Sequence, residues 1–431
     1  MKIASIDSLP NDQAPTVAIS ANPAPNRHLN ISRRPQLAPE LNCFRPGQPL
    51  STIRFIANAN SVHVARWLTL LSHTHARVEI ETANHVPAYA NEFLSSRPLL
   101  PGWLKIPMVL RYLLSGLRLR FFHSRRLPGL VHAHCTSGNG FVAWLSGQRY
   151  LIGAYGTEIF GAHERGFVYR WMLRKVLQGA ERIQVGSTEC IKILQEQYQI
   201  APERIYCFHN GLDEQFFHGV DDQSRMQMRR ERDLPVDEPI WIVNRRTHPH
   251  YRTREIVEGF LGHCQQGGPG RLVLLCGDHQ ADYTQSICEL LQSHTHGNRV
   301  TVVQQMLSHL EVAAWLQLSD FSISVPKTDM FSVSTYESLG CGAVLIVANL
   351  EAYRPLQPCQ AVHWMTQYEP QDFTQVFAKT AATWPTQHRA QRNECLQFAQ
   401  EGFSSENAIR DIAAFYQGVP LRKDAMAKWA A

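Results

Sequence analysis

The segment that says most about the fold is Asp329-Met-Phe-Ser-Val-Ser-Thr-Tyr-Glu337-Ser-Leu-Gly340-Cys-Gly342-Ala-Val-Leu-Ile346. Residues 332–339 have a composition compatible with a helix, and Ser332 or Ser334 can serve as its N-cap. The Gly-x-Gly that follows suits a helix end and a tight turn. Residues 343–347 form an apolar run of the kind found in buried parallel strands. The stretch is therefore predicted to be a loop, a helix and a buried strand.

Two carboxylates, Asp329 and Glu337, stand eight positions apart across the start of this helix. The free N–H groups of a helix N-terminus point outward and its dipole favours negative charge, so such a terminus binds anions. We therefore expect Ser332 and Val333 to contact an anionic donor molecule. The two acids would accept hydrogen bonds from hydroxyls of a sugar and a ribose. The alternative is an ordinary surface helix with one N-terminal acid.

The same stretch resembles the signature of retaining family 4 glycosyltransferases (glycosyl transferases group 1), which have the GT-B fold. That signature is a pair of acids with seven residues between them. The resemblance implies that Asp329 meets the donor sugar at the catalytic centre and that Glu337 binds the nucleotide ribose. The family carries the longer Glu at the first position, where this chain has Asp329.

The first ordered segment of the chain predicts a βαβ unit, with strands at 52–57 and 77–81 and a helix at 62–71. The small residues after the first strand are followed by His63-x-x-Arg-Trp. This segment is similar to the N-terminal segment of the glycosyltransferase family, where the loop after the first strand lies on the acceptor side. The resemblance implies that His63, together with Asn60 in the small-residue loop, contacts the acceptor.

A Gly138-x-Gly140 turn follows the predicted strand 130–134 and opens a helix. With Glu158 lying 18 residues past Gly140, the pattern outlines a dinucleotide fingerprint, and an NAD-type oxidoreductase is the competing interpretation. The fingerprint normally opens its domain, whereas here ordered residues precede it. The same region also resembles the family's His-x-His strand and its His-Gly-Ser-Asp turn. That resemblance makes His134 and Glu158 acceptor-side candidates.

Four arginines lie between the predicted strand 239–243 and the predicted helix 255–264: Arg245, Arg246, Arg252 and Arg254. Guanidinium groups match phosphate oxygens, so this loop is a candidate diphosphate clamp. The family has an Arg and usually a Lys five residues later. We assign the catalytic position to Arg246, with Arg252 and Arg254 as helpers. Gly277, which ends the predicted strand 271–276, is a further donor-side candidate.

The domain organisation follows from these segments. Residues 1–50 are rich in proline and carry no apolar period, which is typical of a flexible leader. We predict two doubly wound, Rossmann-like α/β domains facing a cleft, the GT-B architecture. The boundaries are expected at 51–215 for an acceptor-side domain and 216–390 for a nucleotide-sugar-binding domain. Residues 391–431 are expected to form helices that pack back toward the first domain.

Composition constrains the cellular compartment and the partners that we expect for the protein. No run of 18 apolar residues and no signal peptide is found, and ten cysteines are scattered without a Cys-x-x-Cys pair, so a cytoplasmic protein is expected. Residues 52–215 carry 18 Lys and Arg against 11 Asp and Glu, a basic excess that suits an anionic membrane or a phosphate-bearing acceptor. Ordinary solubilising charge explains the excess equally well.

Residues 100–126 interleave aromatic and aliphatic side chains with arginines. We favour a core-packed helix with a solvated basic side. The alternative is an interfacial element in contact with the inner face of a membrane.

The resemblance implies a hexosyltransferase that moves a sugar from a nucleotide-sugar, UDP-sugar being the first expectation, to a saccharide or lipid-linked acceptor with retention. Cell-surface polysaccharide or glycolipid synthesis would be its setting. No metal is expected, since the histidine pairs lack a third ligand at the usual spacing. No cofactor and no nucleic-acid partner are expected either, the nucleotide-sugar being a substrate. An inactive GT-B-like nucleotide-binding subunit is a third interpretation, beside the oxidoreductase.

Overall fold

The computed structural model describes residues 52–59, 61–72, 74, 76–83, 94–122, 130–277 and 279–421. The predicted leader, residues 1–50, and the candidate Asn60 lie outside the described residues.

The first domain is built on a seven-stranded parallel sheet. Its strands, in spatial order, are β3 (Leu94–Pro98), β2 (Arg77–Thr82), β1 (Thr52–Ile56), β4 (Leu130–His134), β5 (Tyr150–Gly153), β6 (Arg182–Val185) and β7 (Ile205–Cys207). The central strands are buried along almost their whole length, as parallel strands covered on both faces must be, although β1 carries Arg54 and β4 carries His132 and His134. The chain reverses its direction of travel between β1 and β4, which makes this the switch point of the sheet.

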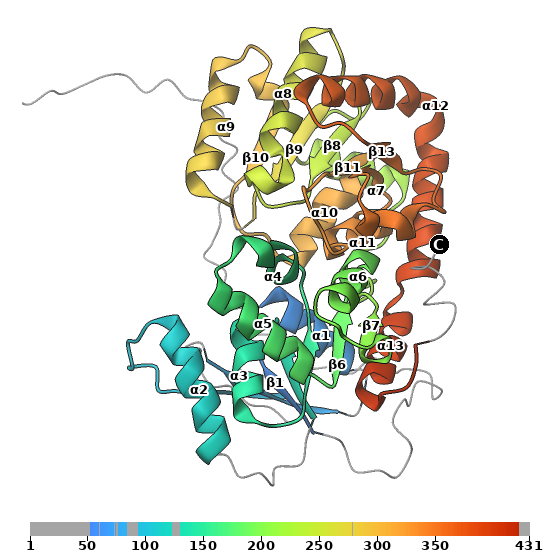
Figure 1. The fold of residues 1–431 in the computed structure, drawn as a ribbon. Helices are drawn as coiled ribbons and strands as arrows, with labels where there is room; N and C mark the ends of the chain where they lie inside the picture. The colour runs from blue at the N-terminus through green and yellow to red at the C-terminus, as the bar shows by residue number, and fades with distance from the viewer. Residues whose placement is uncertain are drawn as a thin grey trace, which may run out of the picture. The chain divides into compact units, whose positions relative to one another are not determined.

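Helices cover both faces of the first sheet, because right-handed crossovers change face at the switch point. The crossover helix α1 (Val62–Ser72) contacts the C-terminal helix α13 (Ser405–Gln417). On the other face α2 (Met108–Phe122) lies against α3 (Gly138–Ser146), and α3 contacts α5 (Phe167–Gly179). Figure 1 shows α2, α3 and α5 following one another as one layer. The short helix α4 (Thr157–Phe160) and helix α6 (Thr188–Glu196) complete the domain.

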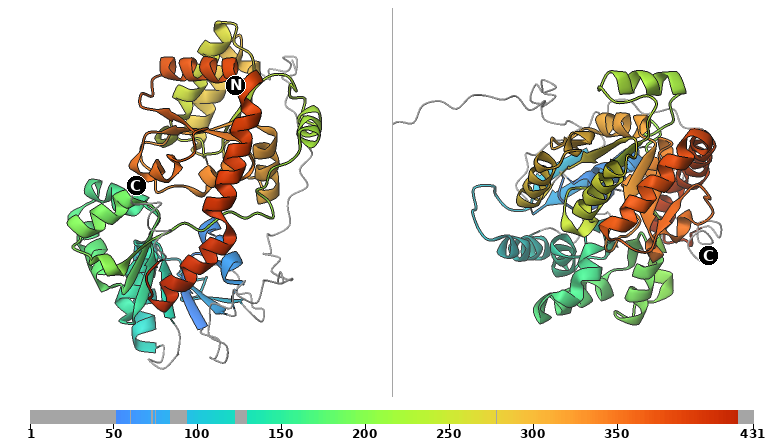
Figure 2. Two further views of the ribbon diagram at one scale, coloured as in Figure 1. Left: turned by 90° about the vertical axis from the view of Figure 1, so that its right-hand side faces the viewer. Right: turned by 90° about the horizontal axis from the view of Figure 1, so that it is seen from above.

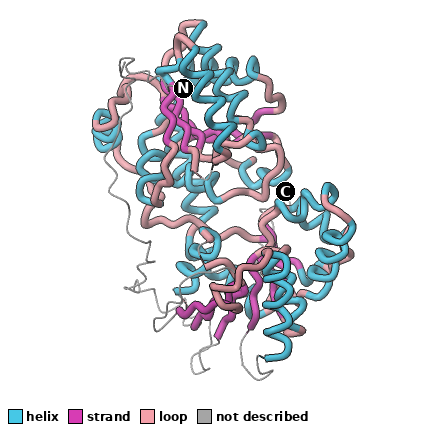
Figure 3. Tube along the Cα trace, turned by 90° about the vertical axis from the view of Figure 1, so that its left-hand side faces the viewer, coloured by secondary structure: helices cyan, strands magenta, loops and turns pink. Residues whose placement is uncertain are grey.

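The second domain repeats the plan with six parallel strands. In spatial order these are β10 (Val300–Val303), β9 (Arg271–Leu275), β8 (Ile240–Val243), β11 (Phe321–Ser324), β12 (Val344–Ala348) and β13 (His363–Met365). Its helices are α8 (Thr253–Gln265), α9 (Ala281–Ser293), α10 (His309–Leu318) and α11 (Val333–Gly340). Figure 3 shows helices flanking the strands of each sheet. The switch point lies between β8 and β11. The predicted pair of doubly wound domains is confirmed.

Residues 329–346 fold as their sequence predicts. Ser332 is the N-cap residue of α11, and the helix ends at Gly340. Gly342 has φ +80, a left-handed conformation that side chains rarely adopt, and this explains the second glycine of the Gly-x-Gly. All five residues of β12 are buried.

A buried acid joins the segment between the sheets to the second domain. Helix α7 (Asp222–Arg230) carries Arg225 and Arg229, which both form ion pairs with Asp320, a residue with no solvent exposure. The Asp320 carboxylate also accepts a hydrogen bond from the N–H of Ile240 at 2.6 Å. Burial opposes its ionisation, but the arginines hold the pKa of Asp320 well below its usual value.

The C-terminal helices run from the second domain to the first. Helix α12 (Pro370–Phe403) lies against α8 and α11, and Figure 2 shows it as a long helix beside the second sheet. Pro385 lies inside α12. Helix α13 then reaches the first domain, where Tyr416 bonds His132 of β4 through atoms Oη and Nδ1 at 2.7 Å. The boundary expected at 390 falls within α12.

Candidate active site at the two switch points

The carboxyl ends of β8 and β11 bring together the residues that the sequence singles out in the second domain. In open parallel sheets, ligands bind outside the strand ends at the switch point, where neighbouring loops diverge. Arg245 and Arg246 follow β8, and Asp329 follows β11. Residues 84 positions apart in the sequence therefore meet, since Arg245 Nη1 lies 3.0 Å from Asp329 Oδ2.

Both oxygens of the Asp329 carboxylate accept hydrogen bonds from protein groups. Its Oδ2 atom accepts from Arg245 and from the hydroxyl of Tyr353 at 2.6 Å, and its Oδ1 accepts from the N–H of Met330 at 2.9 Å. Arg245 also donates to the hydroxyls of Ser332 and Ser334. These bonds tie the loop after β11 to the start of α11. Asp329 thus fixes the shape of the helix N-terminus that would face an anion.

Arg245 and Arg246 are neighbours with opposite environments. The Arg245 side chain is largely buried, and its guanidinium lies 4.5 Å from the ring centroid of Tyr251. Burial lowers the pKa of Arg245, but Asp329, Tyr353 and Tyr251 together more than offset this, so the pKa lies above its usual value. Arg246 is exposed and makes no hydrogen bond or ion pair with the described residues. Its Cβ lies beside Gly277, since a Cβ built on Gly277 would be 3.9 Å away.

The two other arginines of this loop have partners. Arg252 Nη1 donates to the carbonyl of Val325 at 2.6 Å, and its guanidinium lies over the ring of Tyr368. Arg254 is exposed and forms an ion pair with Glu258 one turn along α8, at 2.8 Å. Among the four arginines, Arg246 alone presents a guanidinium without a partner in the described part of the chain.

Glu337 lies in the middle of α11 and is half-buried. No hydrogen bond or ion pair with a described residue engages its carboxylate. Burial raises the pKa of Glu337 to about 7, the charge of Asp213 adds to the rise, and the charge of Arg66 opposes it. Arg66 itself forms an ion pair with Asp213 at 3.1 Å and donates to the carbonyl of Asn210. Glu337 therefore carries unused acceptor capacity close to the connection between the two domains.

The first switch point is lined by aromatic rings. The ring of His63, at the start of α1, stacks on Tyr155 with a centroid distance of 4.4 Å. Tyr155 Oη in turn lies 2.6 Å from Nδ1 of the buried His134, at the end of β4. Burial lowers the pKa of His63, and burial with the charges of neighbouring histidines holds the pKa of His134 well below its usual value. Both imidazoles are therefore neutral at pH 7.

Glu158 closes the Gly138-x-Gly140 turn. Its carboxylate accepts from the N–H of Thr136 at 2.6 Å and from the N–H of Ser137 at 3.3 Å, just before α3 begins. The ring of Tyr112 covers Gly138, where a Cβ would overlap it. An internal anion and an aromatic ring thus occupy the place where a dinucleotide fingerprint binds its diphosphate. This arrangement disfavours the oxidoreductase interpretation.

The loops of the two domains touch through Met330. Its side chain lies against Gly156, which follows β5, and its carbonyl oxygen lies 2.5 Å from a Cβ built on Gly186, which follows β6. Gly156 also has φ +91. The carboxyl ends of the two sheets therefore face one another across this contact.

Sequence reasoning missed several contributors to these sites. Tyr353, which bonds Asp329, lies in no local pattern that marks it. Tyr155 stands at the first position of the turn that resembles His-Gly-Ser-Asp, but its stacking on His63 follows only from the fold. Arg245 could have been separated from Arg246 only by knowing that the former reaches Asp329. Groups of three or more His, Cys, Asp or Glu that could hold a metal ion are absent from the described residues.

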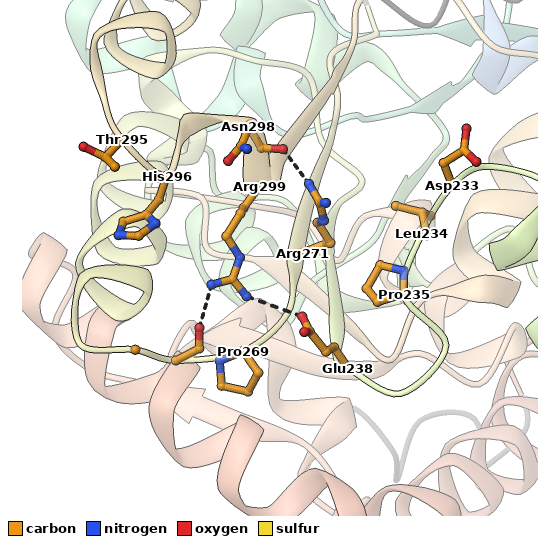
Figure 4. A pocket seen from close by; sticks show the side chains of 12 residues that line it. Asp233, Leu234, Pro235, Glu238, Pro269, Arg271, Thr295, His296, Asn298 and Arg299 are labelled. Carbon is orange, nitrogen blue, oxygen red and sulfur yellow. Dashed lines mark hydrogen bonds and ion pairs between the residues drawn. The ribbon is translucent and has the colours of Figure 1, made fainter. Parts of the chain in front are cut away.

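A hollow of about 750 Å³ lies at the opposite edge of the second sheet, before β8, β9 and β10 begin. Its cations already have partners, as Figure 4 shows: Arg299 is 3.4 Å from Glu238 and Arg271 donates to the carbonyl of Asn298. The hollow is therefore distinct from the switch-point site, and its arginines stabilise the surrounding loops.

Comparison with solved structures identifies the fold family of the two domains. No model of a protein family matches the sequence, and no curated protein matches it. Among solved structures, sucrose-phosphate synthase from Thermosynechococcus elongatus is similar with a TM-score of 0.70 and 17% identity, covering 85% of this chain and 98% of that one. HepE from Anabaena in complex with UDP has a TM-score of 0.67 at 11% identity, covering 86% and 100%.

The catalytic domain of starch synthase IV from Arabidopsis thaliana, bound to ADP and acarbose, gives a TM-score of 0.66 at 12% identity, covering 86% of this chain and 99% of that one. The similarity thus extends over both domains. The chain has the GT-B fold. At these identities the likeness concerns architecture, and the chemistry is argued from the site.

Proposed function

We propose that the chain is a retaining glycosyltransferase that moves a hexosyl group from a nucleotide-sugar to a saccharide or lipid-linked acceptor. The observation that carries the proposal is the pair of unpartnered charges in the second domain. Arg246 and Glu337 have no hydrogen-bond or ion-pair partners among the described residues. Arg246 lies in the arginine loop, and Glu337 is the second acid of the pair that resembles the glycosyltransferase signature. Similar GT-B structures hold UDP, UDP-glucose and ADP, which supports a nucleotide-sugar as the donor.

The proposed chemistry is displacement at the anomeric carbon of the donor sugar. Negative charge develops on the leaving diphosphate, and groups placed to meet that charge lower the barrier. Arg246 would meet it as a fully charged donor. The N–H groups at the start of α11, around Ser332 and Val333, would add a fixed positive potential. The ion pair of Asp329 with Arg245 holds this helix start in place.

Glu337 would accept hydrogen bonds from the ribose hydroxyls, since its carboxylate has free acceptor capacity. Arg252, Arg254 and Gly277 are assigned weaker donor-side roles, because both arginines already have protein partners. The neutral rings of His63 and Tyr155 would face the acceptor and help to position it. Cell-surface polysaccharide or glycolipid synthesis is the proposed setting.

A thermal-shift panel tests the proposal directly. A ligand that binds only the folded state raises the melting temperature by mass action. We expect a UDP-, GDP- or ADP-sugar, with UDP-sugars first, to raise the melting temperature while NAD leaves it unchanged. A shift with NAD alone would replace the proposal with the oxidoreductase.

Turnover separates an enzyme from a binding subunit. The nucleotide-sugar that gives the largest shift is incubated with a panel of saccharide and lipid-linked acceptors, and release of the nucleoside diphosphate is followed with the anomeric configuration of the product. Binding without diphosphate release, even by slow hydrolysis, would contradict catalysis.

A further inference from the structure

The outer layer of the first domain carries an unusual concentration of exposed apolar side chains. Thirteen large hydrophobic residues are exposed in the described part of the chain, and nine of them belong to α2, α5 and the loop before α2. Phe122 is 83% exposed, Val109 78% and Phe167 74%. We call this layer the α2–α5 face; its exposed apolar members are Trp103, Met108, Val109, Leu110, Phe121, Phe122, Phe167, Val168 and Trp171.

The face is continuous, because α3 bridges the two helices. On the side toward α2, Gly116 lies against Leu145 of α3, where a Cβ would be 2.6 Å away. Toward α5, the half-buried Trp144 of α3 contacts Trp171 edge to face at a centroid distance of 6.0 Å. The core-packed helix that the sequence predicts for residues 100–126 therefore describes only the inner side of α2. The inner side of α2 is buried against α3, whereas its outer side is apolar as well as basic.

Positive charge surrounds these apolar side chains. Residues 94–122 contain five Lys or Arg and no Asp or Glu, and residues 161–180 contain four Lys or Arg and a single acid, Glu164. Arg111 is buried and holds the carbonyl of Leu104 at 2.7 Å, so it belongs to the domain itself. The exposed cations of the two segments are Arg97, Lys105, Arg118, Arg120, Arg165, Arg170, Arg174 and Lys175.

We propose that the α2–α5 face docks the protein on a membrane surface that carries anionic lipids. Aromatic and aliphatic side chains beside Lys and Arg are the composition of elements that lie in a lipid interface. A two-fold dimer through this face would oppose like charges, since each copy would present the same basic surface. Exposed aliphatic residues such as Val109 and Val168 have no role against a nucleic-acid backbone. The helices in the described part of the chain include none that could span a lipid bilayer.

The inference goes beyond the proposed function, because lipid binding needs neither donor nor acceptor. Attachment should be reversible and sensitive to salt, since exposed charges are screened within about 10 Å at 0.1 M salt. Docking would hold the first domain, which carries the acceptor-side rings, next to lipid-linked molecules.

Vesicle co-sedimentation of the full chain tests the surface. Neutral phosphatidylcholine vesicles are compared with vesicles that contain phosphatidylglycerol, at low and at high salt. We expect most of the protein to sediment with the anionic vesicles at low salt and to return to the supernatant at high salt. Each cation near such a surface strengthens attachment severalfold, so R118E together with R120E should lower the partition coefficient about tenfold or more.

Two further variants separate the apolar contribution from general surface effects. F121S with F122S should weaken binding to anionic vesicles, while the matched pair M226S with V419S, which removes exposed apolar side chains elsewhere, should leave it unchanged. R230E with K379E serves as the charge control, since both cations are exposed and lie outside the face. Circular dichroism melting confirms that each variant is folded.

Several results would overturn the proposal. These are equal recovery in the supernatant with both vesicle types at low salt, or equal losses in the control pairs and the face variants. Binding to single-stranded DNA without vesicle binding would assign the face to nucleic acid. A concentration-dependent dimer in analytical ultracentrifugation that F121S with F122S abolishes would assign it to a second copy of the chain.

Discussion

The two switch points of this protein share a topology but differ in chemistry. Both lie where a parallel sheet reverses its strand order, at β1 and β4 in one domain and at β8 and β11 in the other. The second holds a charged cluster of Arg245, Asp329 and the exposed Arg246. The first holds the stacked rings of His63 and Tyr155, with neutral imidazoles.

Under the proposed function, this difference would divide the two substrates between the two switch points. A charged crevice suits a nucleoside diphosphate, whose oxygens need cations and helix N–H groups. A neutral aromatic crevice suits a sugar or another uncharged acceptor, which offers hydroxyls and C–H faces. The topology places both sites at strand ends, and under the proposed function the side chains decide which substrate each site binds.

The largest expected effect concerns Arg246. Because this guanidinium is exposed and unpaired among described residues, R246A should lower turnover about 100-fold while leaving the melting temperature nearly unchanged. Diphosphate release at saturating donor, with a melting curve, measures both quantities. The matched control is R254A, which removes an exposed arginine of the same loop that already pairs with Glu258. Equal losses in the two variants would show that the charged crevice has no specific clamp.

Asp329 should matter for stability, whereas Arg246 should matter for turnover. Removal of its carboxylate leaves the largely buried Arg245 without its counter-ion, so D329A should lower the free energy of unfolding by about 3 kcal/mol. Y353F, which removes one hydrogen bond to the same oxygen, should cost about 1 kcal/mol. Urea unfolding of both variants measures the difference. If D329A unfolds like the wild-type protein, Asp329 does not hold the loop.

The raised pKa of Glu337 predicts that the affinity for the donor depends on pH. E337Q should weaken nucleotide-sugar binding by about 1.5–3 kcal/mol, the cost of losing charge-assisted hydrogen bonds. Since burial raises the pKa of Glu337 to about 7, the carboxylate becomes charged, and donor affinity should increase, as pH rises from 6 to 8. Calorimetry across this range should give a rising affinity for the wild-type protein and a flat profile for E337Q. Identical profiles would remove the ribose role.

The same pKa has the reverse effect on stability. A folded-state pKa above the ordinary carboxyl value means that the folded state binds the proton more tightly than the unfolded state. The contribution of Glu337 to stability should therefore fall as pH rises from about 4.5 to about 7. E337Q should lose this component of the pH profile of the unfolding free energy.

The smallest expected effects lie in the neutral crevice. H63A removes a ring that stacks on Tyr155, so it should raise the KM for the acceptor severalfold while the KM for the donor stays constant. Y155F removes the hydrogen bond to His134 and should cost about 1 kcal/mol of stability. Initial rates with each substrate varied in turn measure the split. A change in donor KM alone would mean that the two crevices do not divide the substrates as proposed.

The second switch point was largely predictable from the sequence. Buried strands such as β12 are continuous apolar runs, and helix α11 begins after a serine and ends at a glycine, so both can be recognised from the local sequence. Because chemistry in such sheets lies at strand ends, the residues after β8 and β11 were identified as candidates. Helix α5 was not predicted, since it lacks acidic first-turn residues and its sequence is mostly exposed.

The alternation of strands and helices and the segments that carry chemistry can be predicted from the sequence, because they depend on the apolar period, caps and glycines within a few residues. The folded structure was needed to show which of two adjacent arginines is paired, which tyrosine meets Asp329 and what fills the Gly138-x-Gly140 turn. Those outcomes depend on partners far away in the chain, since Tyr353 lies 24 residues from Asp329 and Arg245 lies 84. Short-range patterns determine local structure, whereas the free energy of a buried charge depends on every group that the fold brings around it.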